Sequence, residues 1–379
     1  MKIITNVARD GMGGIQTANR GLFKALDPHT DTVIALEIAL QRRMRAAVAF
    51  RDYSPEFFHH HTVSAFDAMN EIFKRATSLR FIEKEWEPVI EEMRAVLREE
   101  SPDVALLSGT YIVPWAMSIA CEREKIPIVL RYAGVLTRET ENAKPKLKRI
   151  FRQMEQSIAN RADSFIFPSR LCQDVVEKEV LKRSINNATV IPNPVHVPTE
   201  FRSKKVSTID PSTIAAVGRW THIKNFNAYF RLHQHLRREQ WPHQAYFITN
   251  YERAKRVPRS MTRVAPMHYE QLLNFYSTLG LLIIPSYFET FCNVAAEAIL
   301  SGSPVLVSEQ VGFAEYLKAA GLENMVIKDF RNTRLAAERA KELCGTPIPE
   351  KSMATLRSML NPESVRDQIL AVLRETASL

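Results

Sequence analysis

The sequence predicts an α/β protein with two domains, each built on a doubly wound parallel sheet. Its 379 residues exceed what one ordinary hydrophobic core organises, and this length suits two domains. Apolar strand-like runs alternate with segments of helical period, which favours parallel sheets covered by helices. The alternation stops between Pro194 and about Pro211 and then restarts, so we expect one domain on either side of this stretch.

The first half opens with a strand, a glycine loop and a helix. Residues 2–7 form an apolar β-type run, and residues 15–26 have helical spacing. Gly11, Gly13 and Gly14 lie between them and predict a loop. The other elements expected in this half are helices at 88–100 (with Pro88 in the first turn), 113–121, 146–160 and 172–180, and strands at 103–107, 127–131, 164–167 and 189–191.

The second half repeats the alternation and ends on a helix. The expected strands are 213–217, 245–249, 281–285 and 305–308, and the expected helices are 226–238, 269–279, 294–301 and 363–376. We therefore expect an N-terminal domain at 1–195, a linker at 196–211, a C-terminal domain at 212–360, and a segment at 361–379 whose helix packs back toward the N-terminal domain.

The composition is that of a soluble globular protein, with 45% hydrophobic and 25% charged residues. The first residues do not resemble a signal peptide, and no run approaches the roughly 20 apolar residues that span a bilayer. The four cysteines include no CxxC pair, which argues against a zinc site and a disulfide framework. We therefore expect a cytoplasmic protein.

The formal net charge of +9 attracts polyanions, anionic lipid or phosphorylated substrates, although a solvated basic surface explains it equally well. The helix that starts near Lys144 has an apolar stripe and several cations. One interpretation is a core-facing helix with a wet basic face, and the other is peripheral docking on the inner face of an anionic membrane. No nucleic-acid partner is expected. The consecutive histidines His59, His60 and His61 suggest an acceptor-side or surface loop.

Basic residues follow the first strand of the second half. Gly218 and Arg219 come directly after the expected strand 213–217, and Lys224 lies shortly beyond them. Ligands of doubly wound sheets bind beyond the carboxyl ends of the strands. An Arg there can hold a diphosphate bidentately and a Lys as a point charge. The alternative is an ordinary basic loop.

Two glutamates lie further along. Glu297 sits in a helix so apolar that its carboxylate is expected to be buried and to need partners. A vicinal diol such as ribose offers two donors in matching geometry, whereas the alternative is a structural Glu bonded to backbone or Arg. Glu289 lies in the loop before that helix. The first free N–H groups of the helix, around Phe291 to Asn293, form an anion site, so the combination fits a nucleoside diphosphate bearing a sugar.

These segments resemble family 4 of the glycosyltransferases, whose fold is GT-B: two Rossmann-like domains facing each other across a cleft. Glu289 and Glu297 match the spacing of the family's E-x7-E motif, and PSYFETF, SGSPVLVS and VGFAEYL resemble the sequence around it. Gly218, Arg219 and Lys224 match the family's phosphate-binding GR…K segment. In the first half, PDVALL, ADSFIFPS and IPNPV resemble shorter family segments.

The resemblance implies an enzyme of polysaccharide or other glycan synthesis that moves a sugar, with retention, from a nucleoside diphosphate sugar to a hydroxyl acceptor (glycan, lipid-linked or small-molecule). Arg219 and Lys224 would neutralise the leaving diphosphate, and Glu289 would orient the donor sugar. These three are the implied catalytic residues. The implied donor-binding residues are Gly13, Gly14, Gly218, Arg219, Lys224, Met267, Glu289, Thr290, Phe291, Cys292, Asn293 and Glu297.

The resemblance also implies front-face substitution, in which the departing phosphate takes the acceptor's proton and no side-chain nucleophile is needed. No convincing DxD motif is present, so we expect neither a metal nor a cofactor, and the protein's own cations would hold the diphosphate. Gly13 and Gly14 would let backbone N–H groups approach the donor or the acceptor, although they can also simply make a tight turn.

Three departures from the family lie on the acceptor side. Ala133 occupies a place where many members carry His, Ser108–Gly109–Thr110 replaces another such strand end, and Pro194 replaces the Gly of the PNG turn. Competing interpretations are a sugar-nucleotide epimerase, a phosphorylase, a non-enzymatic accessory or polyanion-binding protein with the same fold, and, more weakly, a dinucleotide oxidoreductase, whose fingerprint lacks its third glycine.

Overall fold

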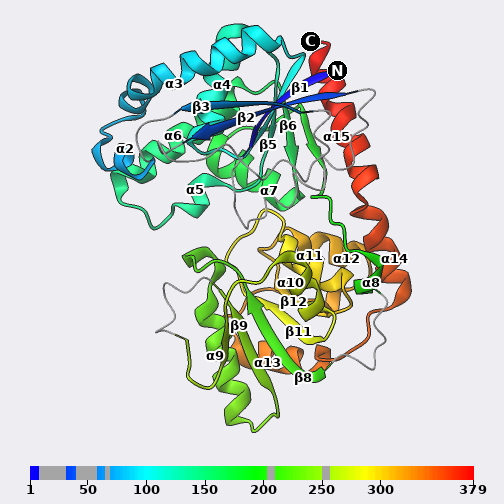
Figure 1. Ribbon diagram of the computed structural model, residues 1–379. Helices are drawn as coiled ribbons and strands as arrows, with labels where there is room; N and C mark the ends of the chain where they lie inside the picture. Colours follow the sequence, from blue (N-terminus) through cyan, green and yellow to red (C-terminus); the bar gives the residue numbers. More distant parts are fainter. Residues whose placement is uncertain (8–30, 40–57, 65–68, 203–209, 250–256) are drawn as a thin grey trace. The chain divides into compact units, whose positions relative to one another are not determined.

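The computed structural model describes residues 1–7, 31–39, 58–64, 69–202, 210–249 and 257–379. The chain forms two compact units (Figure 1). Unit 1 consists of Met1–Pro194 together with Pro362–Leu379, and unit 2 is Val195–Asn361. Each unit has its own sheet and its own hydrophobic core. No helix in the described ranges is both long and apolar enough to cross a bilayer.

The sheet of unit 1 has seven strands in the order β3-β2-β1-β4-β5-β6-β7, and every described pairing is parallel. The chain runs from the central strand β1 to one side and then returns to β4 to continue on the other. This reversal is the switch point of a doubly wound sheet. The strands are β1 (Lys2–Val7), β2 (Thr32–Ala39), β3 (Phe58–Ser64), β4 (Val104–Ser108), β5 (Ile128–Arg131), β6 (Ser164–Phe167) and β7 (Ala188–Val190).

Strand β3 corrects the interpretation of His59–His61 as a loop. These residues pair in register with Ile34–Leu36 of β2, and His59 and His61 contact the carboxylate of Glu100 at 2.9 and 2.6 Å. Hydrogen bonds from the two histidines and from Lys2 outweigh burial and lower the pKa of Glu100 to about 2. The histidines therefore hold a strand to a helix end.

Helix α3 (Leu79–Glu100) starts well before Pro88, so the prediction of Pro88 in a first turn is wrong. Ser78 caps the helix by accepting a hydrogen bond from the N–H of Phe81. The buried stripe from Ile82 to Leu97 continues past the proline, so packing outweighs the lost hydrogen bond. The other helices of this half are α2 (Met69–Arg75), α4 (Ile112–Glu124), α5 (Leu136–Glu139), α6 (Pro145–Arg161), α7 (Arg170–Val175) and a π-helical turn at Val176–Leu181.

The C-terminal helix α15 (Pro362–Ala377) belongs to unit 1, although the chain reaches it only after completing unit 2. Its apolar face, including Val365, Ile369 and Leu373, packs into one cluster with Ile3 and Val104 of the sheet. Burial of a Val, Ile or Leu side chain stabilises by about 1.5–3 kcal/mol. The last helix is therefore part of the core of the first unit.

The sheet of unit 2 has six parallel strands in the order β10-β9-β8-β11-β12-β13. Its switch point lies between β8 and β11. The strands are β8 (Asp210–Val217), β9 (Gln244–Ile248), β10 (Thr262–Val264), β11 (Leu279–Ile284), β12 (Val305–Ser308) and β13 (Val326–Ile327), and the helices are α8 (Thr199–Arg202), α9 (Phe226–Arg238), α10 (Tyr269–Tyr276), α11 (Asn293–Leu300), α12 (Phe313–Ala319), α13 (Thr333–Leu343) and α14 (Glu350–Met359).

The stretch expected as a linker, 196–211, has structure of its own at both ends. Val195 and Val197 are buried in the core of unit 2, and the N–H of Val195 donates to the carbonyl of Leu360 at 3.1 Å. Helix α8 follows, and β8 begins at Asp210. Short apolar residues between prolines carry no period, so the sequence pattern missed this anchoring.

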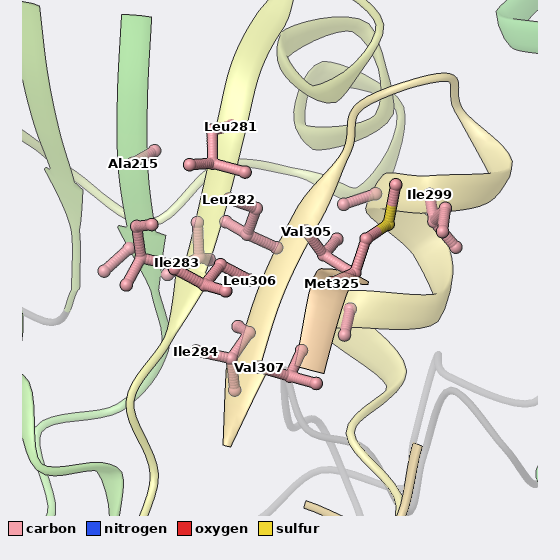
Figure 2. Packing of buried hydrophobic residues seen from close by; sticks show 14 of the residues in the cluster. Ala215, Leu281, Leu282, Ile283, Ile284, Ile299, Val305, Leu306, Val307 and Met325 are labelled. Carbon is pink, nitrogen blue, oxygen red and sulfur yellow. The ribbon is translucent and has the colours of Figure 1, made fainter. Parts of the chain in front are cut away.

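The core of unit 2 lies on both faces of β11 and β12. All six residues of β11 are buried, as expected of a central parallel strand covered by helices. Figure 2 shows Leu282 and Ile284 of β11 beside Val305 and Val307 of β12, with Ile299 of α11 nearby. This packing fixes the strand ends from which the loops of the candidate site emerge.

Candidate functional site

The candidate site lies at the switch point of the second sheet, where the loops after β8 and β11 meet. Main-chain and side-chain bonds join the two loops directly. The N–H of Tyr287 donates to the carbonyl of Ile223 at 2.8 Å, and the side-chain amide of Asn225 donates to the carbonyl of Pro285 at 2.9 Å. The carboxyl edge of adjacent strands at a switch point is where doubly wound sheets bind ligands.

Gly218 provides the turn out of β8. Its φ of +149° is a conformation that side chains rarely adopt, and a Cβ there would lie 3.4 Å from the ring of Phe226. The same Cβ would lie 4.0 Å from Cε of Lys224, so the glycine and the lysine are neighbours. Arg219 is exposed, and no described residue forms an ion pair with it. The first loop thus presents a cation to solvent beside Lys224.

Lys224 and Glu289 are in direct contact. The Nζ of Lys224 lies 2.7 Å from Oε2 of Glu289, with the two side chains 26% and 10% exposed. The hydroxyl of Ser286 donates to the other oxygen, Oε1, at 2.6 Å. Two residues from neighbouring strand ends therefore form a partly buried, hydrogen-bonded ion pair. Such a pair is open enough to exchange partners with a ligand and shielded enough to be strong.

The main chain of Glu289 is held by a third loop, the one after β12. Its N–H donates to the carbonyl of Gln310 at 3.0 Å, and its carbonyl accepts from the N–H of Gly312 at 2.9 Å. Together these bonds make an isolated parallel bridge between Glu289 and Val311. The carboxylate is therefore mounted on a fixed backbone, as a group that must meet a ligand in one orientation requires.

Residues Thr290, Phe291, Cys292 and Asn293 are all buried, so a ligand would meet this stretch mainly through its main chain. Cys292 is the N-cap of α11 and has a φ of +93°, which is costly for a residue with a Cβ. Burial and the charge of Glu289 raise the pKa of its thiol, so it stays protonated. Backbone strain here sits next to the ion pair.

Glu297 is 4% exposed on α11, and burial raises the pKa of its carboxyl to about 8. No hydrogen bond or ion pair joins this carboxyl to a residue that the structure describes. The hydroxyl of Tyr276 is buried without a partner in the same described part of the chain, and the charge of Glu297 adds to burial in raising its pKa. Burial is thus the one cause that raises the pKa of this carboxyl among the described residues.

The structure brings some of the predicted donor-binding residues together and leaves others apart or undescribed. Lys224 and Glu289 touch, and Gly218 adjoins Lys224. Met267 is half-buried and packs on the hydrophobic core between β10 and α10. Gly13 and Gly14 lie outside the described residues.

Sequence reasoning missed residues that support the ion pair. Ser286 bonds Glu289, and Asn225 ties the two loops. Tyr287 is 49% exposed, with its ring centroid 5.4 Å from that of His222, so the rings of the two loops also contact each other. Small polar residues beside a motif carry no period, so only the position of Ser286 directly after a strand could have indicated it.

The polar groups at the strand ends of unit 1 differ in their contacts from those at the strand ends of unit 2. Arg131 at the end of β5 is 3% exposed and donates to the side-chain oxygen of Asn193 at 2.9 Å, and its burial lowers its pKa to about 10. Asn6 exchanges two hydrogen bonds with the main chain of Ser108, joining β1 to β4. Ala133 is partly exposed just beyond Arg131. Here the polar groups mainly bind the chain to itself.

Two family models match the chain. Residues 32–197 match the model described as Glycosyltransferase Family 4, and residues 266–357 match the model described as Family 4 Glycosyltransferase in conflict systems. Together the two ranges cover more than half of the chain. No curated protein has a significant sequence match to the chain.

Solved structures match over almost the whole length. Sucrose-phosphate synthase from Thermosynechococcus elongatus has a TM-score of 0.74 at 16% identity, covering 99% of this chain and 98% of its own. An E. coli trehalose-6-phosphate structure with bound UDP-2-fluoro glucose has a TM-score of 0.66 at 10% sequence identity, and the match covers 100% of this chain and 99% of the other. An α,α-trehalose-phosphate synthase (UDP-forming) from Burkholderia vietnamiensis has a TM-score of 0.64 at 13% sequence identity, and the match covers 99% of each chain. This likeness confirms the predicted GT-B class of two Rossmann-like domains.

Proposed function

The chain belongs to glycosyltransferase family 4, and we propose that it moves a sugar from a nucleoside diphosphate sugar to a hydroxyl group of an acceptor. One observation carries the proposal: Lys224 and Glu289 meet at 2.7 Å at the switch point of the second sheet. A cation for the phosphates and a carboxylate for sugar hydroxyls are thereby placed side by side, where such a sheet binds its ligand.

The two cations, Lys224 and Arg219, stabilise the leaving diphosphate. Negative charge grows on it as the bond to the sugar breaks, and fixed positive charge nearby lowers that barrier. Lys224 is partly buried and acts at close range, while Arg219 is exposed and can close on the phosphates as a fork. With these cations in place we propose a metal-independent reaction.

The two glutamates take different parts of the donor. Glu289, which contacts Lys224, accepts hydrogen bonds from hydroxyls of the transferred sugar. Glu297, whose raised pKa keeps it largely protonated at pH 7, accepts from one ribose hydroxyl and donates to the other. We further propose that the anomeric configuration is retained, with the departing phosphate accepting the acceptor's proton.

The experiment is to incubate the protein with UDP-, GDP- and ADP-sugars and follow nucleotide release. Because one neighbour was solved with UDP-2-fluoro glucose, uridine donors come first. Lys224→Ala, Arg219→Ala and Glu289→Ala should each lower turnover at least about a hundredfold, since each removes a charge that stabilises or orients the transition state.

The matched control removes an ion pair on the surface of the same unit. Arg334→Ala and Glu338→Ala break an exposed contact on α13 and should leave turnover within about twofold of wild type. Tight donor binding without nucleotide release would favour an accessory protein instead. Conversion of the sugar while it remains on the nucleotide would favour an epimerase.

A further inference from the structure

Beside a weak hydrogen bond from the thiol of Cys292, the two oxygens of the Glu289 carboxylate each have a partner of their own. Oε2 lies 2.7 Å from Nζ of Lys224, and Oε1 accepts from the hydroxyl of Ser286 at 2.6 Å. Ser286 is 2% exposed, so its bond is shielded from water, while Lys224 remains 26% exposed. The serine is thus the buried partner and the lysine the accessible one.

These partners respond differently to an incoming diphosphate. The diphosphate of a nucleotide sugar carries two negative charges against one on the carboxylate, so Lys224 is drawn away from Glu289 when the donor binds. Ser286 has no such competitor because its hydroxyl is buried. After the exchange, Ser286 is the stronger of the two buried donors that keep the carboxylate aimed at the sugar, because the thiol of Cys292 donates only weakly.

The main chain of Ser286 is fixed on both sides. The carbonyl of Pro285 before it accepts from the Asn225 amide, and the N–H of Tyr287 after it donates to Ile223. The hydroxyl therefore projects from a rigid segment rather than from a loose loop. Such a group holds its neighbour at little entropic cost.

We propose that Ser286 is a positioning residue that holds the Glu289 carboxylate in its working orientation once Lys224 has moved to the donor diphosphate. This inference rests on the proposed function of the same site. It predicts an effect on turnover larger than the effect on donor binding, because the hydroxyl does not itself touch the phosphates.

The test compares Ser286→Ala with wild type, using the donor that wild type turns over best. We expect kcat to fall by about ten- to a hundredfold, the loss of one hydrogen bond to a charged group. The donor Kd, measured by calorimetry, should change less than about threefold. Ser286→Thr, which keeps the hydroxyl, should recover most of kcat. An unchanged kcat in Ser286→Ala, or an equal loss in kcat and affinity, would overturn the inference.

A matched control separates positioning from general damage. Ser303 is equally buried in unit 2, and its hydroxyl donates only to the main-chain carbonyls of Tyr276 and Leu279. Ser303→Ala should lower the denaturation midpoint while leaving kcat within about twofold of wild type. A fall in kcat as large as that of Ser286→Ala would show that any lost buried hydroxyl has this effect.

A second readout does not depend on activity. The denaturation midpoint is measured for Ser286→Ala alone and again in a Glu289→Ala background. Because the serine's partner is already gone in the second case, the shift should be much smaller there. If wild type releases no nucleotide from any donor, the proposed function fails, yet this cycle still tests the contact. Equal shifts in the two backgrounds would contradict it.

Discussion

Two buried glutamates, one in each unit, differ in the hydrogen bonds that their carboxyls make. Glu155 on α6 is fully buried and accepts hydrogen bonds from Thr110 Oγ1, from the N–H groups of Leu136 and Thr137, and from Thr137 Oγ1, at 2.5 to 3.2 Å. Glu297 on α11 is almost as buried, yet its carboxyl has no bond to a residue within the described ranges.

The two carboxyls differ in their hydrogen bonds rather than in their burial. Burial raises the pKa of both carboxyls, but the four bonds at Glu155 oppose that rise, whereas burial alone acts on Glu297. A satisfied carboxylate fixes the start of α5 after β5. Burial without such bonds disfavours the charged form of Glu297, and a ligand with paired hydroxyls could supply the missing bonds.

The largest effect expected from this comparison is that of Glu155→Gln. An amide keeps one acceptor oxygen but turns an NH2 group toward N–H and O–H donors, so at least two buried bonds are lost. We expect the free energy of unfolding to fall by about 2–4 kcal/mol. Urea denaturation followed by circular dichroism measures this free energy. A loss under 1 kcal/mol would mean that the hydrogen bonds of Glu155 contribute little to stability.

The same substitution at Glu297 should raise the free energy of unfolding at alkaline pH rather than lower it. The folded pKa of about 8 lies above the ordinary value of 4.5, so the stability linked to protonation is complete below pH 4.5 and is lost as the pH rises through 8. Glu297→Gln cannot ionise, so its advantage over wild type should grow by about 1.4 kcal/mol for each pH unit across this window.

Denaturation midpoints of both proteins at pH 5, 6.5 and 8 check this prediction about Glu297. Glu155→Gln serves as the matched variant, because it should be less stable than wild type at every one of these pH values. A Glu297→Gln difference that does not change with pH would place an unseen partner beside the carboxyl.

The smallest effect concerns two buried tyrosines in the core of unit 2. The hydroxyl of Tyr229 donates to the carbonyls of Ile214 and Tyr246 at 3.1 and 2.9 Å, whereas that of Tyr276 has no partner among the described residues. Tyr229→Phe should cost about 1 kcal/mol, and Tyr276→Phe should be neutral or slightly stabilising. Thermal melting of both variants tests this, and an equal loss in the two would show that Tyr276 is bonded.

The sequence predicted the parts of the site that lie in patterned segments. Gly218 and Lys224 follow one strand and Glu289 follows its neighbour in the sheet, so their meeting at one sheet edge followed from the order of strands and helices. Ser286 and Tyr276 were not predicted. Their roles depend on contacts between separate segments, which no local period reports.

The alternation of strands and helices by itself determined two doubly wound parallel sheets, because crossover geometry leaves few other ways to bury such segments. Tertiary structure decided that Lys224 pairs with Glu289, and that the carboxyl of Glu155 gains hydrogen bonds that the carboxyl of Glu297 lacks within the described residues. The physical reason is the distance along the chain over which each signal acts. Apolar period acts within one element, whereas hydrogen bonds and ion pairs act over a few ångströms between residues that only folding brings together.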